Sequence, residues 1–207
     1  MKITCGPLTD LRTVTIELPS EPQKIGVFVS GGIDSAILYY ILLGENQRLG
    51  NIHQLVPFSI LRKEGSKHFA KLVIAHTHAC YNLLYSDPVI VGDTGLSEDK
   101  QVESGVKMVL NVLKFNQVYT GLIEQLPQHM VNWAPIPYKE TDKFKAPFSI
   151  LDKSHIIDIV AKLKQSALFY ITHSCSSYEI GRCNACNGCN ERTWGFEQLG
   201  IIDPGTI

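Results

Sequence analysis

Short apolar runs alternate with amphipathic stretches along most of this 207-residue chain. Runs typical of buried strands lie at 25–29, 52–59, 88–92, 117–123 and 146–151. Apolar residues at helical spacing lie at 34–43, 66–80 and 104–114, and again after Ser154. Strands that alternate with helices predict a Rossmann-like α/β fold, in which a parallel sheet is covered by helices on both faces.

Local signals place several element ends. The stretch 34–43 is apolar all round, which predicts a buried helix that ends at Gly44. Ser154 is the expected cap of the helix that follows it. In 66–80 we expect one face to carry Phe69, Leu72 and Val73 with Ala75 or His76.

Three segments are expected along the chain. Residues 1–23 contain one alternating stretch and end in two prolines, which predicts an arm or strand before the main fold. Residues 24–165 carry the strand–helix alternation and form the main domain. Residues 166–207 hold a cysteine cluster and form a C-terminal metal-binding segment.

A glycine-rich turn separates the first strand from the first helix of the main domain. Two adjacent glycines let the backbone approach a ligand closely, and successive N–H groups at a helix start form an anion site. The hydroxyl groups of Ser30 and Ser35 are further donors, and Asp34 is placed to cap the helix or to hold Mg²⁺. The predicted phosphate-binding residues are Ser30, Gly31, Gly32, Ile33, Asp34 and Ser35.

The string is neither a Walker A loop nor the dinucleotide-binding fingerprint, because no Gly-Lys-Ser/Thr and no G-x-G-x-x-G occurs. It resembles the PP-loop, S-G-G-x-D-S, of the ATP pyrophosphatases. That resemblance implies ATP cleavage between the α- and β-phosphates through an adenylated intermediate. An ordinary capped turn is the alternative, but all five fixed positions in a strand–turn–helix context favour the ATP site.

The net charge and the hydropathy of the chain limit which partners and which cellular location are expected. The chain has 19 Lys and Arg against 20 Asp and Glu, a net charge of −1, which gives no electrostatic argument for nucleic acid or membrane binding. The first residues lack an apolar signal segment, and the longest apolar run, 36–43, is too short to span a bilayer. We therefore expect a cytoplasmic protein.

Four of the six cysteines lie close together. Cys5 and Cys80 are isolated, whereas the others follow the pattern C-x7-C-x2-C-x2-C, which predicts a metal site in a reducing compartment. Four thiolates favour a closed, structural zinc site, with Arg182 and Arg192 as flanking cations. A C-x-x-C redox pair and an iron–sulfur cluster on the last three cysteines are the alternatives. The predicted ligands are Cys175, Cys183, Cys186 and Cys189.

The PP-loop followed by this cysteine cluster resembles the 7-cyano-7-deazaguanine synthase family of the queuosine pathway. Further matches are 172–175, the Cys-x2-Cys-x2-Cys-x2-Arg string that ends at Arg192, and Asp203-Pro204. The resemblance implies an adenine nucleotide alpha hydrolase-like fold and a ligase that converts a deazapurine carboxylate, with ammonia, to its amide or nitrile. It also implies ATP, Mg²⁺ and Zn²⁺ as cofactors and suggests a homodimer.

The middle of the chain departs from that family. The family's Tyr-Gly-Gln…His string is replaced by Phe58-Ser-Ile-Leu-Arg-Lys63, and its substrate-recognition string is absent from 121–138. No general base is assigned. Further candidates are Lys153 for phosphate or substrate, Asp93 for Mg²⁺, Trp133 and Tyr138 for base stacking, and His173 as a substitute metal ligand, whereas His76 and His78 read as structural.

Two other functions remain open at this point. A tRNA-modifying PP-loop enzyme of the thiolation type would share the loop, although the near-neutral charge and the four-fold cysteine cluster do not favour it. A zinc-stapled, non-catalytic nucleotide-binding module would keep the metal site with an inactive loop.

Overall fold

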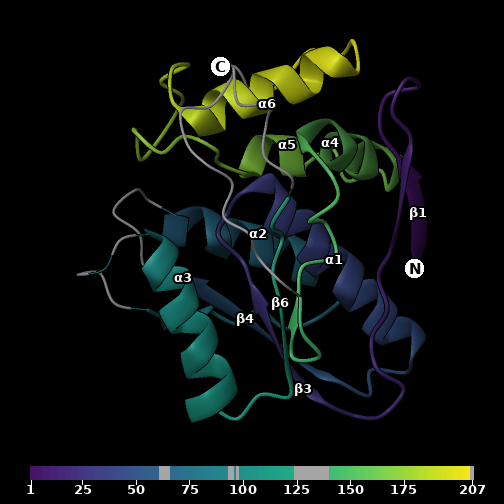
Figure 1. The fold of residues 1–207 in the computed structure, drawn as a ribbon, viewed down its shortest axis with the longest axis vertical. Helices are drawn as coiled ribbons and strands as arrows, with labels where there is room; N and C mark the ends of the chain where they lie inside the picture. The colour runs from purple at the N-terminus through teal and green to yellow at the C-terminus, as the bar shows by residue number, and fades with distance from the viewer. Residues whose placement is uncertain (61–65, 93–95, 97, 124–139, 206–207) are drawn as a thin grey trace.

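The computed structural model describes residues 1–60, 66–92, 96, 98–123 and 140–205 (Figure 1). Its main sheet contains five parallel strands in the order β5-β4-β3-β6-β7. The strands are β3 (Lys24–Phe28), β4 (Gln54–Ile60), β5 (Val89–Val91), β6 (Gln117–Tyr119) and β7 (Phe144–Lys145). The predicted parallel α/β fold is confirmed.

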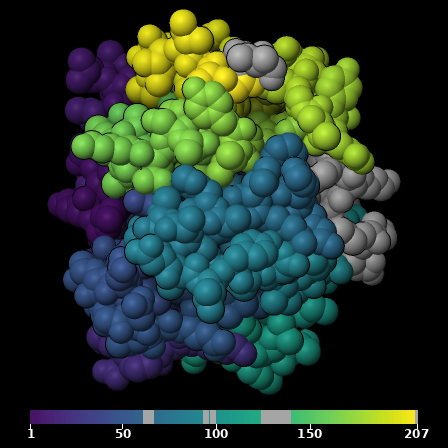
Figure 2. Space-filling model, turned by 180° about the vertical axis from the view of Figure 1, so that it is seen from behind, coloured from purple at the N-terminus to yellow at the C-terminus, as the bar shows by residue number. Residues whose placement is uncertain are grey.

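Helices cover both faces of the sheet. They are α1 (Ile33–Arg48), α2 (Ser66–Cys80), α3 (Glu98–Lys107) with a π-helical turn at Met108–Val112, α4 (Lys153–Lys162), α5 (Leu168–Ile171) and α6 (Asn187–Gln198). Figure 1 shows α3 in front of the sheet, and Figure 2 shows α1 and α2 on the opposite face. None of the described helices is long and apolar enough to cross a membrane.

Alternation along the central strand explains the two layers. Ile25 and Val27 of β3 join a core shared with α1, α2 and α4, whereas Phe28 joins a second core against α3. Residues of a strand point to opposite faces in turn, so a strand with apolar residues on both sides must lie inside the sheet. This is why the sequence signal for β3 is a continuous apolar run.

The strand order sets the place where a ligand binds. The chain runs from β3 to β4 and β5 on one side and then returns to β6 on the other side of β3. In sheets of this kind, ligands bind beyond the carboxyl ends of the strands where the order reverses. That place lies after β3 and β6, and the PP-loop follows β3.

The N-terminal arm is a hairpin. Strands β1 (Lys2–Cys5) and β2 (Arg12–Thr15) pair antiparallel in a separate two-stranded sheet that packs against α4. The amino group of Met1 contacts the Glu45 carboxylate of α1 at 2.9 Å. The sequence pattern predicted only the second strand, because alternation is visible over the six residues 13–18 but over only four residues at β1.

Three predicted element ends are wrong. Helix α1 continues past Gly44 to Arg48, where Asn46 pairs with the backbone of His53, and Gly44 instead makes room for Tyr81. The last strand lies at β7 rather than 146–151, which forms turns. The cap of α4 is Asp152, which accepts the N–H groups of residues 154 and 155.

The predicted face of α2 is also partly wrong. The buried residues of this helix are Ala70, Val73, Ile74, Thr77 and His78, whereas Leu72 is 38% exposed. A buried hydrogen bond between the Tyr39 hydroxyl and His78 Nε2 draws this histidine inward, at 2.7 Å. His78 is therefore structural, as expected.

Candidate functional site: a PP-loop joined to a cysteine cluster

Hydrogen bonds of its own serines hold the PP-loop in shape. The Ser30 N–H donates to Ser35 Oγ at 3.1 Å, and the Ser35 hydroxyl donates to the Gly32 carbonyl at 3.1 Å. Gly32 is the N-cap of α1 in an extended conformation and provides no side-chain cap. The first N–H groups of a helix have no acceptor within the helix, so this start presents donors for an anion.

Gly31 is required by packing as well as by the loop. Its φ is +86°, and a Cβ there would lie 2.7 Å from Phe69 Cβ and 2.8 Å from the Ala70 nitrogen of α2. Its carbonyl accepts the His173 N–H at 3.0 Å. The loop is thus held between α2 and the segment that leads to the cysteine cluster.

Gly121 is a site residue that sequence reasoning did not select. It follows β6, and a Cβ at this position would lie 2.6 Å from the Ser35 nitrogen and 2.8 Å from the Asp34 carbonyl carbon. The absence of a side chain lets the backbone after β6 touch the start of α1. The available signal was a glycine inside the predicted strand 117–123, where a glycine often marks the close approach of another backbone.

Asp34 does not cap α1 but pairs with Lys153. The Lys153 ammonium at the start of α4 lies 2.7 and 2.6 Å from the two Asp34 carboxylate oxygens. It also lies 3.0 Å from Glu191 Oε2 of α6, and only 4% of the lysine side chain is exposed. Burial lowers the pKa of Lys153, but the two carboxylates outweigh this, so its pKa is raised and the ammonium stays charged.

Lys153 therefore remains a candidate phosphate contact. Glu191 is a site residue that the sequence analysis did not select. No local pattern marks Glu191 as a site residue, because a lone acid in a helix is usually solvated. Burial is the main cause that raises the pKa of Glu191, and the Lys153 charge opposes it.

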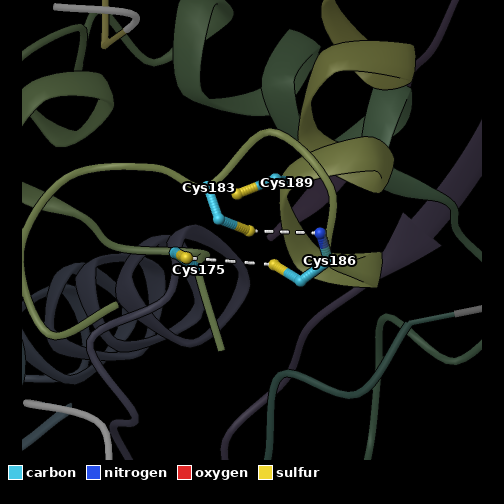
Figure 3. A group of neighbouring side chains, drawn as sticks. All are labelled: Cys175, Cys183, Cys186 and Cys189. Carbon is cyan, nitrogen blue, oxygen red and sulfur yellow. Dashed lines mark hydrogen bonds between the residues drawn. The ribbon is translucent and has the colours of Figure 1, made fainter. Parts of the chain in front are cut away.

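The four clustered cysteines converge on one point. Their sulfur atoms all lie within 4.8 Å of one another, and Figure 3 shows them turned toward each other. Cys186 is the N-cap of α6 and Cys189 lies in its first turn, while Asn184 adopts a positive φ of 55° in the knuckle. The predicted ligand set comes together in full.

Backbone N–H groups point at three of these sulfurs. Cys183 accepts from the nitrogens of Ala185 and Cys186, Cys186 accepts from Ser176, and Cys175 accepts from Tyr178, at 3.2 to 3.4 Å. Burial raises the pKa of Cys186, but hydrogen bonds from the N–H groups of Ser176 and Cys189 outweigh it and lower the pKa to about 5. Burial raises the pKa of Cys189 to about 11.

The donor set fits a single metal ion. Ligands about 2.3 Å from one tetrahedral ion lie roughly 3.8 Å from each other. The sulfurs of Cys175 and Cys186 lie 3.9 Å apart. N–H donors directed at sulfur favour the thiolate form that a metal requires.

The two arginines that flank the cluster play different parts. Arg182 lowers the pKa of Cys189 against the effect of burial and donates to its carbonyl at 3.1 Å, as expected of a cation beside a thiolate site. Arg192 instead pairs with Asp203 at 2.8 Å from both Nε and Nη2 and ties the chain end to α6. Arg182 also reaches Asp203, at 2.6 Å.

Neither His173, the candidate substitute ligand, nor His76 belongs to the cysteine cluster among the described residues. His173 stacks on Phe69 with ring centroids 4.4 Å apart, and its Nε2 contacts the Tyr178 carbonyl. His76 is half-buried and contacts Gln165 at 3.2 Å. Asp93, Trp133 and Tyr138 lie outside the described residues.

A second group of possible metal ligands is already paired with other protein side chains. Asp10, Asp152 and His155 lie within 4.8 Å of one another. Asp152 caps α4 and contacts His155 Nδ1 at 2.7 Å, while Arg12 pairs with Asp10 at 2.6 Å. These contacts fasten the N-terminal hairpin to α4.

The family comparison bears on the segment that holds the cysteines. Residues 119–200 match the family described as queuosine biosynthesis protein QueC. The predicted resemblance to this family of PP-loop enzymes is confirmed. The QueC match begins at β6 and contains Lys153, Glu191 and all four cysteines. It supports an ATP-utilising PP-loop enzyme.

Two other comparisons add little beyond the QueC match. No curated protein matches the chain. Among solved structures, the chain is similar to the U34-tRNA thiolase NcsA from Methanococcus maripaludis with its 4Fe–4S cluster, at 14% identity and a TM-score of 0.47. That similarity covers 90% of this chain and 69% of the other.

Proposed function

We propose that this protein is an ATP-dependent carbon–nitrogen ligase that converts a 7-deazaguanine carboxylate to its amide or nitrile with ammonia. The observation that carries the proposal is the Lys153 ammonium, which joins the Asp34 carboxylate of the PP-loop to the QueC-like segment. A phosphate-binding loop and a cationic side chain at one strand end are what cleavage of ATP to AMP and pyrophosphate requires.

The proposal assigns a role to the polar groups of the loop and to Lys153. The N–H groups at the start of α1 and the hydroxyls of Ser30 and Ser35 would hold the pyrophosphate oxygens. Lys153 would neutralise charge that develops on the leaving group, and Asp34, once released by the lysine, would hold Mg²⁺. Adenylation would make the substrate carboxylate reactive toward ammonia.

The cysteine cluster would hold zinc in a structural role. Four thiolates leave no open coordination position for catalysis. The sulfur spacing also supports a single ion, because a cluster of several irons would separate the thiolates further. The boundaries 24–165 and 166–207 for an ATP-binding domain and a zinc-binding segment stay a prediction.

Incubation with ATP, Mg²⁺, ammonia and 7-carboxy-7-deazaguanine, followed by mass spectrometry, tests the reaction. The expected result is the amide or nitrile of this acid together with AMP and pyrophosphate. AMP release without any change in the acid would overturn the substrate and keep the ATP chemistry. Failure of the protein to bind Mg·ATP would overturn the enzyme itself in favour of a zinc-stapled binding module with a degenerate loop.

Metal analysis tests the cluster separately. One zinc per colourless chain is expected. Iron with a brown colour would contradict the zinc assignment and would direct the substrate test toward tRNA thiolation.

A further inference from the structure

Lys153 lies between two carboxylates that come from opposite ends of the chain. Asp34 belongs to the PP-loop and Glu191 to the helix that carries Cys189. The lysine side chain is 4% exposed, and those of Asp34 and Glu191 are 21% and 23% exposed. Two negative groups thus share one buried positive group.

Helix α6 is shaped to bring Glu191 to this lysine. Gly195 lies four residues after Glu191 and therefore on the same face of the helix. A Cβ at Gly195 would lie 2.8 Å from Lys153 Cγ and 2.8 Å from Ile157 Cδ1 of α4. The missing side chain lets α6 settle directly on Lys153, and Phe196 anchors the helix in the core.

The start of α6 is fixed as closely. A Cβ at Gly188 would lie 1.9 Å from the Ser174 carbonyl oxygen. Cys186 and Cys189 flank this glycine, so the cysteine cluster and the tight contact hold the same turn. Glu191 follows within one further turn of the helix.

We propose that Glu191 is a positioning residue that holds Lys153 for the phosphates at the PP-loop. This inference rests on the proposed function for its ATP-dependent part. If Asp34 held Mg²⁺, the lysine would need a second partner to stay at the strand end, and Glu191 would be that partner. Without Glu191, the lysine pairs with Asp34 alone and is released less readily.

This role and simple charge repulsion predict opposite results. Glu191 adds a negative charge near the place where the triphosphate would bind, so its removal would tighten ATP binding if charge alone mattered. If Glu191 positions Lys153, its removal weakens binding. The sign of the change therefore decides between the two.

The first experiment measures binding of Mg·α,β-methylene-ATP, which cannot be cleaved between the α- and β-phosphates, by calorimetry. Glu191→Gln is expected to weaken binding about tenfold with unchanged metal content, and Glu191→Asp to recover part of it. Glu197→Gln, an exposed acid on the same helix, is the matched control and should bind as the wild type does. Equal or tighter binding by Glu191→Gln would overturn the proposal.

The second experiment does not need ATP. The rate at which acetic anhydride acylates Lys153 is followed by mass spectrometry of the peptide that contains it. Glu191→Gln should raise this rate several-fold, and Glu197→Gln should leave it unchanged. An unchanged rate in Glu191→Gln with a faster rate in Asp34→Asn would refute the positioning role. Absence of analogue binding by the wild type would refute the proposed function alone.

Discussion

The PP-loop (30–35) and the cysteine loop (175–189) are held in shape by different kinds of group. The PP-loop relies on backbone groups and two glycines, and it is flanked by Val29 and Ala36, which are fully buried. The cysteine loop relies on side chains, and its residues from 176 to 181 are all exposed. A loop that lies on a packed core holds its shape alone, whereas an exposed loop needs another source of order.

This difference implies that substitutions and metal loss affect the two sites differently. The PP-loop should be formed before a ligand arrives, since the sheet and α1 fix both of its ends. The cysteine loop should depend on its metal, because a site of this kind gains its folding free energy from binding. Helices α4 and α6 connect them through Lys153 and Glu191, so damage to one loop can reach the other.

Cys186→Ser should have the largest effect. Loss of one of four thiolates should abolish metal binding and remove the order of residues 175–189, because this loop has little packing of its own. Metal analysis and hydrogen exchange measure both, with strong protection expected to persist in β3. Cys80→Ser, which changes a cysteine outside the cluster, is the control; retention of metal by Cys186→Ser would show that three thiolates suffice.

Asp34→Asn should nearly abolish turnover while the fold remains. A lost carboxylate at the phosphate site should reduce the rate of pyrophosphate release by about 10²–10³-fold. The stability cost should stay near 1 kcal/mol, because Lys153 keeps Glu191 as a partner. Steady-state kinetics and urea unfolding measure the two effects, and a full loss of stability would mean that the PP-loop depends on this ion pair for its shape.

Sequence reasoning located both loops because their chemistry lies in short, contiguous strings. The order of strands and helices was also readable, since buried strands and amphipathic helices have different periods. The predicted cap of α4, Ser154, was wrong for a local reason. Asp152 and Ser154 are both good caps, and only the structure shows that Asp152 accepts the free N–H groups.

What could not be predicted lies in contacts between distant segments. A lysine beside a helix start is usually solvated, yet Lys153 is buried between residues 119 positions before it and 38 positions after it. Gly121 and Gly195 matter because another backbone or side chain occupies the space of a Cβ. No local pattern records such proximity in a single sequence.

Gly31→Ala should destabilise the protein through the PP-loop. The positive φ disfavours alanine, and the new Cβ would meet Phe69 and the backbone of Ala70. Strain and overpacking together should cost about 3 kcal/mol. Urea unfolding measures this, and Gly50→Ala is the matched control, because its φ is +79° and no atom lies within 4 Å of its Cβ position. Equal losses in both variants would show that backbone strain, and not the contact with α2, fixes the loop.

Asp152→Asn should have the smallest effect and should depend on pH. Burial raises the pKa of Asp152, but hydrogen bonds from His155 and Ser154 outweigh it and lower the pKa from 3.8 to about 2. That difference, at ~1.4 kcal/mol per pH unit, corresponds to about 2 kcal/mol of stability. A depressed carboxyl pKa stabilises the fold above the unfolded value and loses its effect as the pH falls through the folded value. The stability gap between wild type and variant should therefore be full at pH 6 and close between pH 4 and pH 2 in urea titrations. A gap that is constant over this range would assign the stabilisation to the shape of the cap and not to its charge.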